Sequence, residues 1–150
     1  MEFPILNNNI PKLYDNEVLF LEKKNINFII DEKSYGGIIY LSNLRLVFVS
    51  SEYSFDIPLA NITEEIFNQP VFSSNNLSGY VKMIEDERTI KKWKIQFYDS
   101  VNTFLNIFTY SLSKMREYLA EPEEKKTNIQ TPVSAFIDPN DSSILYVSSI

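Results

Sequence analysis

Residues 38–57 read IIYLSNLRLVFVSSEYSFDI, and this stretch indicates the fold class. Two runs of β-branched and aromatic residues, 38–41 and 45–50, are separated by the turn-like tripeptide SNL, which predicts two neighbouring strands. Residues 53–57 alternate apolar and polar side chains, the two-residue period of a half-buried strand, and Pro58 ends the run. Three short strands in succession predict an antiparallel sheet.

Short strands are also predicted on both sides of this stretch. The expected strands are 17–22, 25–31, 38–41, 45–50, 53–57, 77–84 and 93–98. We expect Lys23-Lys24 to form the hairpin between the first two strands and Gly36-Gly37 to interrupt the chain. Residues 63–68 fit either a helix or a strand.

The hydrophobic period changes after residue 100. Apolar residues then recur at steps of three and four, which predicts one amphipathic helix. The apolar positions are Val101, Phe104, Leu105, Phe108, Leu112, Met115 and Leu119. Ser100 or Asn102 is expected to cap the beginning of the helix, and Glu121-Pro122 to end it. One helix after about seven strands predicts a mainly β fold, a barrel or sandwich with one open end covered by the helix.

The length and charge of the chain fit one compact domain with two flanking segments. The sequence has 150 residues, of which 44% are hydrophobic, and a formal net charge of −6. We expect an irregular lead-in at 1–16, the folded domain at 17–120, and an acidic linker and tail at 121–150. The negative charge disfavours direct nucleic-acid binding. Because the tail regains apolar residues, we expect 143–148 to be extended and docked, either on its own sheet or on a second copy as a homodimer.

The residue types exclude most catalytic chemistry. The sequence has no cysteine, no histidine and three glycines. It therefore lacks the ligands of Cys/His zinc sites, the parts of Ser-His-Asp and Cys-His nucleophiles, and the common glycine-rich phosphate loops. Neighbouring carboxylates such as Glu64-Glu65 or Asp86-Glu87 would point to opposite faces of a strand. We expect no enzyme activity, no cofactor and no metal.

The termini and the apolar runs bear on location. The chain begins without a basic segment followed by an apolar one, and no apolar run approaches a membrane span. A cytoplasmic protein is expected, neither secreted nor transmembrane, with the nucleus and the membrane periphery left open.

Two stretches resemble GRAM domains. GIIYLS at 37–42 followed by LRLVFVS at 44–50 is similar to the glycine, "YLT"-like strand, turn and "RLIFVS"-like strand of that family. QPVF at 69–72, followed by Asn75, Leu77, Gly79, Val81 and Lys82, resembles the "QPVFGANYIKGTVKA" block of the WW-domain-binding protein 2 branch. The resemblance covers about residues 17–119.

The resemblance implies a pleckstrin-homology-like fold, in which two near-orthogonal antiparallel sheets are capped by a C-terminal helix. It implies an adaptor rather than a catalyst, with protein partners and phosphoinositide membrane surfaces as expected ligands. The branch also implies an alternative, a nuclear transcriptional coregulator that acts through protein partners on chromatin without binding lipid. Its members recruit WW domains through PPxY motifs, but Pro-Pro occurs nowhere here, so WW-domain binding is not expected.

Two groups of residues are candidate sites. Lys23, Lys24 and Arg45 are the candidates for a lipid headgroup. The resemblance implies phosphate contacts at the first hairpin, which is expected to hold the two lysines, and Arg45 would add a bidentate contact. The candidate partner-binding loop consists of Gln69, Pro70, Val71, Phe72 and Asn75. The alternative for this loop is a structural turn with Phe72 inside the barrel.

Two smaller expectations concern single positions. A second basic group, Arg88, Lys91, Lys92 and Lys94, is expected to be neutralised by the acids beside it in sequence. Gly37 and Gly79 are expected where the backbone geometry or a close approach requires glycine.

Overall fold

The structure is a computed structural model that describes residues 3–83, 86, 88–121, 136–137 and 145–146. Strands and one long helix form the described chain. They are β1 (Leu6–Asn7), β2 (Ile10–Pro11), β3 (Leu19–Ile30), β4 (Lys33–Ser42), β5 (Arg45–Val49), β6 (Ser54–Pro58), the 3-10 turn η1 (Leu59–Asn61), β7 (Ile62–Asn68), β8 (Asn75–Lys82), β9 (Ile90–Phe97), α1 (Asn102–Ala120), β10 (Phe136–Ile137) and β11 (Leu145–Tyr146).

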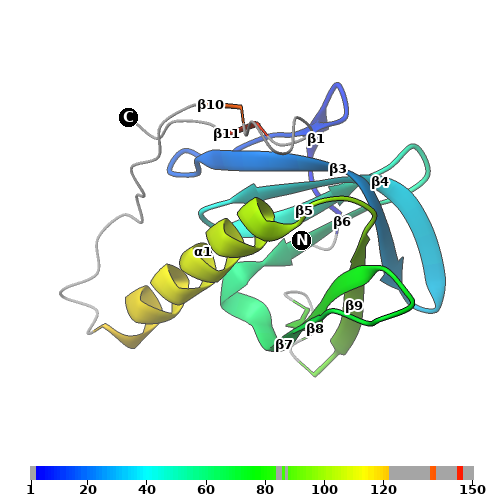
Figure 1. The fold of residues 1–150 in the computed structure, drawn as a ribbon. Helices are drawn as coiled ribbons and strands as arrows, with labels where there is room; N and C mark the ends of the chain where they lie inside the picture. Colours follow the sequence, from blue (N-terminus) through cyan, green and yellow to red (C-terminus); the bar gives the residue numbers. More distant parts are fainter. Residues whose placement is uncertain (1–2, 84–85, 87, 122–135, 138–144, 147–150) are drawn as a thin grey trace.

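Seven antiparallel strands make up the main sheet, in the order β6-β5-β4-β3-β9-β8-β7. The long strand β3 belongs to both halves, because it pairs with β4 along its length and with β9 over Ile26–Ile30. Figure 1 shows β3 to β6 as one layer, β7 to β9 as another, and α1 across one end. The expected mainly β fold with about seven antiparallel strands and one C-terminal helix is confirmed.

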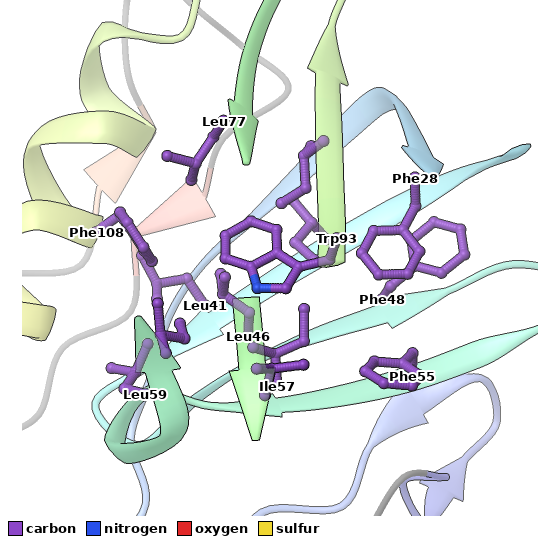
Figure 2. Packing of buried hydrophobic residues seen from close by; sticks show 14 of the residues in the cluster. Phe28, Leu41, Leu46, Phe48, Phe55, Ile57, Leu59, Leu77, Trp93 and Phe108 are labelled. Carbon is purple, nitrogen blue, oxygen red and sulfur yellow. The ribbon is translucent and has the colours of Figure 1, made fainter. Parts of the chain in front are cut away.

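The core lies between these layers and is rich in aromatic side chains. Trp93 is fully buried at its centre, and Figure 2 shows it beside the aliphatic residues of β4 to β6. The rings of Phe28 and Phe48 stack with centroids 4.6 Å apart. The predicted helical stripe supplies the buried side chains Val101, Phe104, Phe108, Leu112 and Met115, whereas Leu119 is 46% exposed. Burial of this stripe holds α1 on the sheet.

The predicted hairpin at Lys23-Lys24 is wrong. β3 continues through both lysines, with an irregularity in its pairing between Lys23 and Ile26 and a positive φ of 56° at Asn25. The hairpin lies instead at Asp31 and Glu32, whose φ angles of 52° and 64° are those of a tight two-residue turn.

Other local expectations are also corrected or resolved. β4 runs through Gly36-Gly37 without a break, and residues 62–68 form a strand. The lead-in contains the short β1–β2 hairpin. The helix begins after Val101 with no side-chain cap, so neither Ser100 nor Asn102 caps it. Its end before Glu121 is confirmed.

The tail is described at two short segments. β10 and β11 pair with each other, and β11 lies beside β3. Leu145–Tyr146 is therefore extended, as predicted for 143–148, whereas the other residues of that prediction lie outside the described part of the chain.

Candidate functional site

Lys23 is a buried cation in the irregular part of β3. Its side chain is 0% exposed and forms an ion pair with Asp99, which is 37% exposed and lies just before α1. The amide of Asn25 also donates to Asp99 Oδ2 at 3.4 Å. Lys23 thus joins the sheet to the segment that leads into the helix.

Lys24, the next residue, faces solvent. Its side chain is 56% exposed, and its ammonium lies 3.9 Å from a carboxylate oxygen of Glu22. It lines a hollow of about 560 Å³ together with Asn25, Tyr98 and Asp99. Gly36 and Gly37 also line this hollow and contribute no side chains to it.

Arg45 belongs to a separate, buried network. Its Nε donates to Glu17 Oε2 at 2.8 Å, and its Nη1 donates to Asp56 Oδ2 at 2.9 Å. Its Nη2 donates to the backbone carbonyl of Lys12 at 2.8 Å, and the ring of Tyr14 covers the guanidinium at 4.5 Å. The network therefore holds the lead-in against β5 and β6.

Burial and charge shift the ionisation in this network. Burial raises the pKa of Asp56, although the charge and hydrogen bond of Arg45 act in the opposite direction. Burial by itself would lower the pKa of Arg45, but the hydrogen bond to Glu17 and the charge of Asp56 raise it above its usual value. Asp56 Oδ1 is buried and has no hydrogen-bond partner among the described residues. Two carboxylates thus share one buried guanidinium.

The three predicted headgroup residues are not brought together. Lys23 and Arg45 are buried in different ion-pair networks, so only Lys24 of the three offers an exposed charge. Headgroup binding by this set stays a prediction. The hairpin that joins the first two long strands, where the resemblance places phosphate contacts, carries the carboxylates of Asp31 and Glu32.

The candidate partner-binding loop projects from the sheet between β7 and β8. Val71 is 85% exposed and Phe72 is 99% exposed. Phe72 is therefore not inside the barrel, and that alternative is wrong. The base of the loop is fixed by the pairing of Asn68 with Asn76, whose side chains also bond at 3.2 Å. The loop thus presents two apolar side chains to solvent above a hydrogen-bonded hairpin base.

One member of the second basic group, Lys91, forms an ion pair with Asp31 at 2.8 Å, on the turn between β3 and β4. Asp86 accepts hydrogen bonds from the backbone of Arg88 and the hydroxyl of Thr89. Glu85 and Glu87 lie outside the described residues.

Neither a metal centre nor a spanning helix is found within the described ranges. No group of three or more His, Cys, Asp or Glu side chains in that part of the chain could hold a metal ion. No described helix is both long and apolar enough to cross a membrane.

Sequence reasoning missed the network around Arg45. The alternation of residues 53–57 predicts that Asp56 faces solvent, but Asp56 is buried, at 4% exposure, because Arg45 partners it. The partner Glu17 could not be identified, since it is 28 residues from Arg45. The exposure of Val71 and Phe72 had no comparable signal.

The architecture is pleckstrin-homology-like, with seven antiparallel strands closed at one end by the C-terminal helix. One solved structure with this arrangement is the Vps36 N-terminal PH domain, which matches with a TM-score of 0.62 and 12% sequence identity. The match covers 78% of this chain and 95% of that domain. No protein-family model matches the sequence, and no curated protein matches it. At this identity the likeness shows the fold alone.

Proposed function

We propose that the protein is a noncatalytic adaptor module of the GRAM type, which binds a partner protein through residues 69–75. The observation that carries the proposal is the exposure of Val71 and Phe72, at 85% and 99%, on the β7–β8 hairpin. Loops on a rigid β scaffold commonly carry recognition. The pleckstrin-homology-like fold and the GRAM resemblance support an interaction module.

The chemistry of the loop favours a protein over a charged ligand. No charged residue occurs from Ile66 to Val81, although the chain has 20 acidic and 14 basic residues. A fully exposed phenylalanine gains about 2 kcal/mol when it is buried in a partner's pocket. Aromatic side chains are common anchors in protein interfaces. An apolar pocket on a partner is the surface that fits Phe72.

The residue types support a noncatalytic module. A chain without cysteine and histidine has neither the usual nucleophile–base pairs nor a neutral-pH general base of the imidazole type. The buried acids Glu17 and Asp56 are both bonded to Arg45. Such a site stabilises the fold.

Site-specific photocrosslinking tests the proposal. A benzophenone amino acid is placed at Phe72 of the full chain expressed in cells, and at Ile90 as the control, because Ile90 is also exposed, at 57%. We expect discrete protein adducts from position 72 that are absent from position 90, and that are competed by the unmodified chain. Equal adducts from both positions, or none from position 72, would contradict partner binding by the loop.

A second candidate function, binding to phosphoinositide membranes, is favoured by the hollow beside Lys24. Asn75 pairs with Phe97, so the apolar loop lies at the same end of the sheet as Tyr98, which lines that hollow. An exposed cation and an apolar tip on one end are features that suit a membrane surface.

Flotation with phosphatidylinositol 4,5-bisphosphate vesicles tests this second candidate. At low salt, where electrostatic attraction is strongest, Lys24→Glu should reduce binding, whereas Lys33→Glu, at another exposed lysine, should not. No flotation of the native chain at low salt, or equal loss in both variants, would reject the Lys24 site.

A further inference from the structure

β7 is an edge strand of the main sheet. It is last in the strand order and pairs with β8 on one side, and no strand of the described chain pairs with its other side. An edge strand offers unpaired backbone N–H and C=O groups that can accept a further strand. Ile66, in the middle of β7, is 56% exposed, so the edge also has an apolar side chain.

The first half of this edge is protected against pairing. The register shifts between Thr63 and Ile66, and Glu64 has a positive φ of 52°. Arg116 of α1 donates to both carboxylate oxygens of Glu65, at 2.6 and 2.9 Å, and its Nη2 lies 3.5 Å from the carbonyl oxygen of Ile62. A bulge, two acids and a covering helix are the usual protections of an edge.

The second half lacks these protections. From Ile66 to Asn68 the pairing with β8 is regular, and no residue is charged. The strand then leads directly into the loop with Val71 and Phe72. Three exposed apolar side chains, Ile66, Val71 and Phe72, therefore belong to one continuous segment.

A groove lies next to this segment, at Glu65, the last residue of the protected half of β7. It has a volume of about 450 Å³ and lies between β7 and α1, with Glu65, Phe108, Leu112 and Arg116 in its lining. Phe108 and Leu112 are buried at 2% and 3% exposure, so the floor is apolar. Glu65 in the lining is bonded to Arg116, and Glu117 lies 3.4 Å from Lys114, whereas Glu64, next to Glu65 on β7, is exposed.

We propose that residues 66–68 bind an extended segment of a partner protein as an added strand of the sheet. The inference rests on the proposed function and specifies the mode of binding. The segment pairs its backbone with β7, packs alternate apolar side chains on Ile66, and meets Phe72 at one end. At the other end a lysine or arginine of the segment meets the exposed carboxylate of Glu64. Proline is excluded where the segment must donate its N–H groups.

Selection from a random 12-residue peptide display library against the full chain tests this mode. We expect the enriched peptides to alternate apolar residues, to carry a basic residue towards one end, and to lack proline in the alternating part. The affinity of the enriched peptides should fall at least about tenfold with Ile66→Lys, a loss of about 1.4 kcal/mol. It should be unchanged with Ile90→Lys, because Ile90 is equally exposed, at 57% against 56%, and lies outside this edge.

Hydrogen exchange separates strand addition from contact with the loop alone. Bound peptide should slow hydrogen exchange of at least one backbone amide in 66–68 of the native chain. As a control for folding, Ile66→Lys and Ile90→Lys should both retain the native melting temperature. If no peptide is enriched, if Ile66→Lys has no effect, or if these amides are unchanged, strand addition is rejected. Peptides that lose affinity with Val71→Ser/Phe72→Ser but not with Ile66→Lys would keep the proposed loop function and reject the added strand. Peptides that lose affinity with Ile66→Lys but not with Val71→Ser/Phe72→Ser would keep the added strand and reject binding by the loop.

Discussion

Gly37 lies directly against the backbone of Val49 on the neighbouring strand. A Cβ atom at Gly37 would come within 2.4 Å of the Val49 carbonyl oxygen and 2.8 Å of a ring carbon of Phe48. A Cβ atom at Gly36, the preceding residue, would meet no heavy atom within 4 Å. Neither glycine has a positive φ, so the requirement at Gly37 is one of space rather than backbone conformation.

Alanine should destabilise the protein at Gly37 but not at Gly36. Gly37→Ala forces a shift of backbone or of a core ring, so we expect a loss of about 2 kcal/mol in the free energy of unfolding. Gly36→Ala should change it by less than about 0.5 kcal/mol, or raise it by restricting the unfolded chain. Urea denaturation of both variants measures the difference. Similar values for the two would show that the sheet adapts easily at Gly37.

The ion pair of Lys23 and Asp99 should respond unequally to the loss of each partner. Lys23 is 0% exposed and Asp99 is 37% exposed. Asp99→Ala removes a counter-charge from a buried ammonium and should cost about 3 kcal/mol. Lys23→Met leaves a carboxylate that water can reach and retains an apolar stem, so its cost should be smaller. Chemical denaturation at neutral pH compares them, and a larger loss for Lys23→Met would contradict the explanation.

Most strands along the chain and the single helix could be predicted because each has its own local hydrophobic period. The same local reasoning predicts a hairpin at Lys23-Lys24, because two charged residues interrupt an apolar run. The partner that allows Lys23 to stay in a strand, Asp99, is 76 residues away. The true turn at Asp31 and Glu32 has no glycine, and its positive φ angles could not be anticipated from residue type alone.

The position of the candidate loop in the chain was predictable, but the exposure of its aromatic side chain was not. The block from Gln69 to Asn75 was identified from its sequence, but an aromatic residue such as Phe72 is usually taken as core. Its exposure depends on where the hairpin pairing of Asn68 with Asn76 ends. Arg45 is predicted as a headgroup ligand, but its partners Glu17 and Asp56, 28 and 11 residues away, bury its charge.

The network of Arg45 should make stability depend on pH through Asp56. Burial raises the pKa of Asp56 above its usual value of 3.8, so the folded state binds this proton more tightly than the unfolded state. The contribution of Asp56 to stability therefore increases as the pH falls through its folded pKa, and it is lost as the pH rises above that value.

Asp56→Asn removes this titration and keeps an oxygen that can accept from Arg45 Nη1. We expect the wild type to gain stability relative to Asp56→Asn as the pH is lowered from 7 towards 4. Asp56→Ala should be less stable than Asp56→Asn at pH 7, because it leaves the guanidinium with one acceptor fewer. Urea midpoints of the wild type and the two variants over this pH range measure both differences. If the wild type became less stable relative to Asp56→Asn as the pH fell, the raised pKa would be contradicted.

The pair of Glu65 and Arg116, which fastens α1 to the edge strand β7, should depend on pH in the opposite direction. The hydrogen bond from Arg116 lowers the pKa of Glu65 below its usual value of 4.5, although partial burial acts against it. Because the pKa is lowered, the stabilisation by this ion pair is present above about the unfolded pKa of Glu65 and is lost as the pH falls through the folded pKa.

Because the side chain of Arg116 is 48% exposed, solvent screening limits the pair to about 0.5 kcal/mol. Glu65→Gln should therefore lower stability by about that amount at pH 7, and the difference from wild type should vanish as the pH is taken well below 4.5. Glu117→Gln is the control, since its carboxylate is 63% exposed and lies 3.4 Å from Lys114 on the helix surface, where less is lost. A Glu65→Gln defect that persists at low pH would assign the effect to packing rather than to charge.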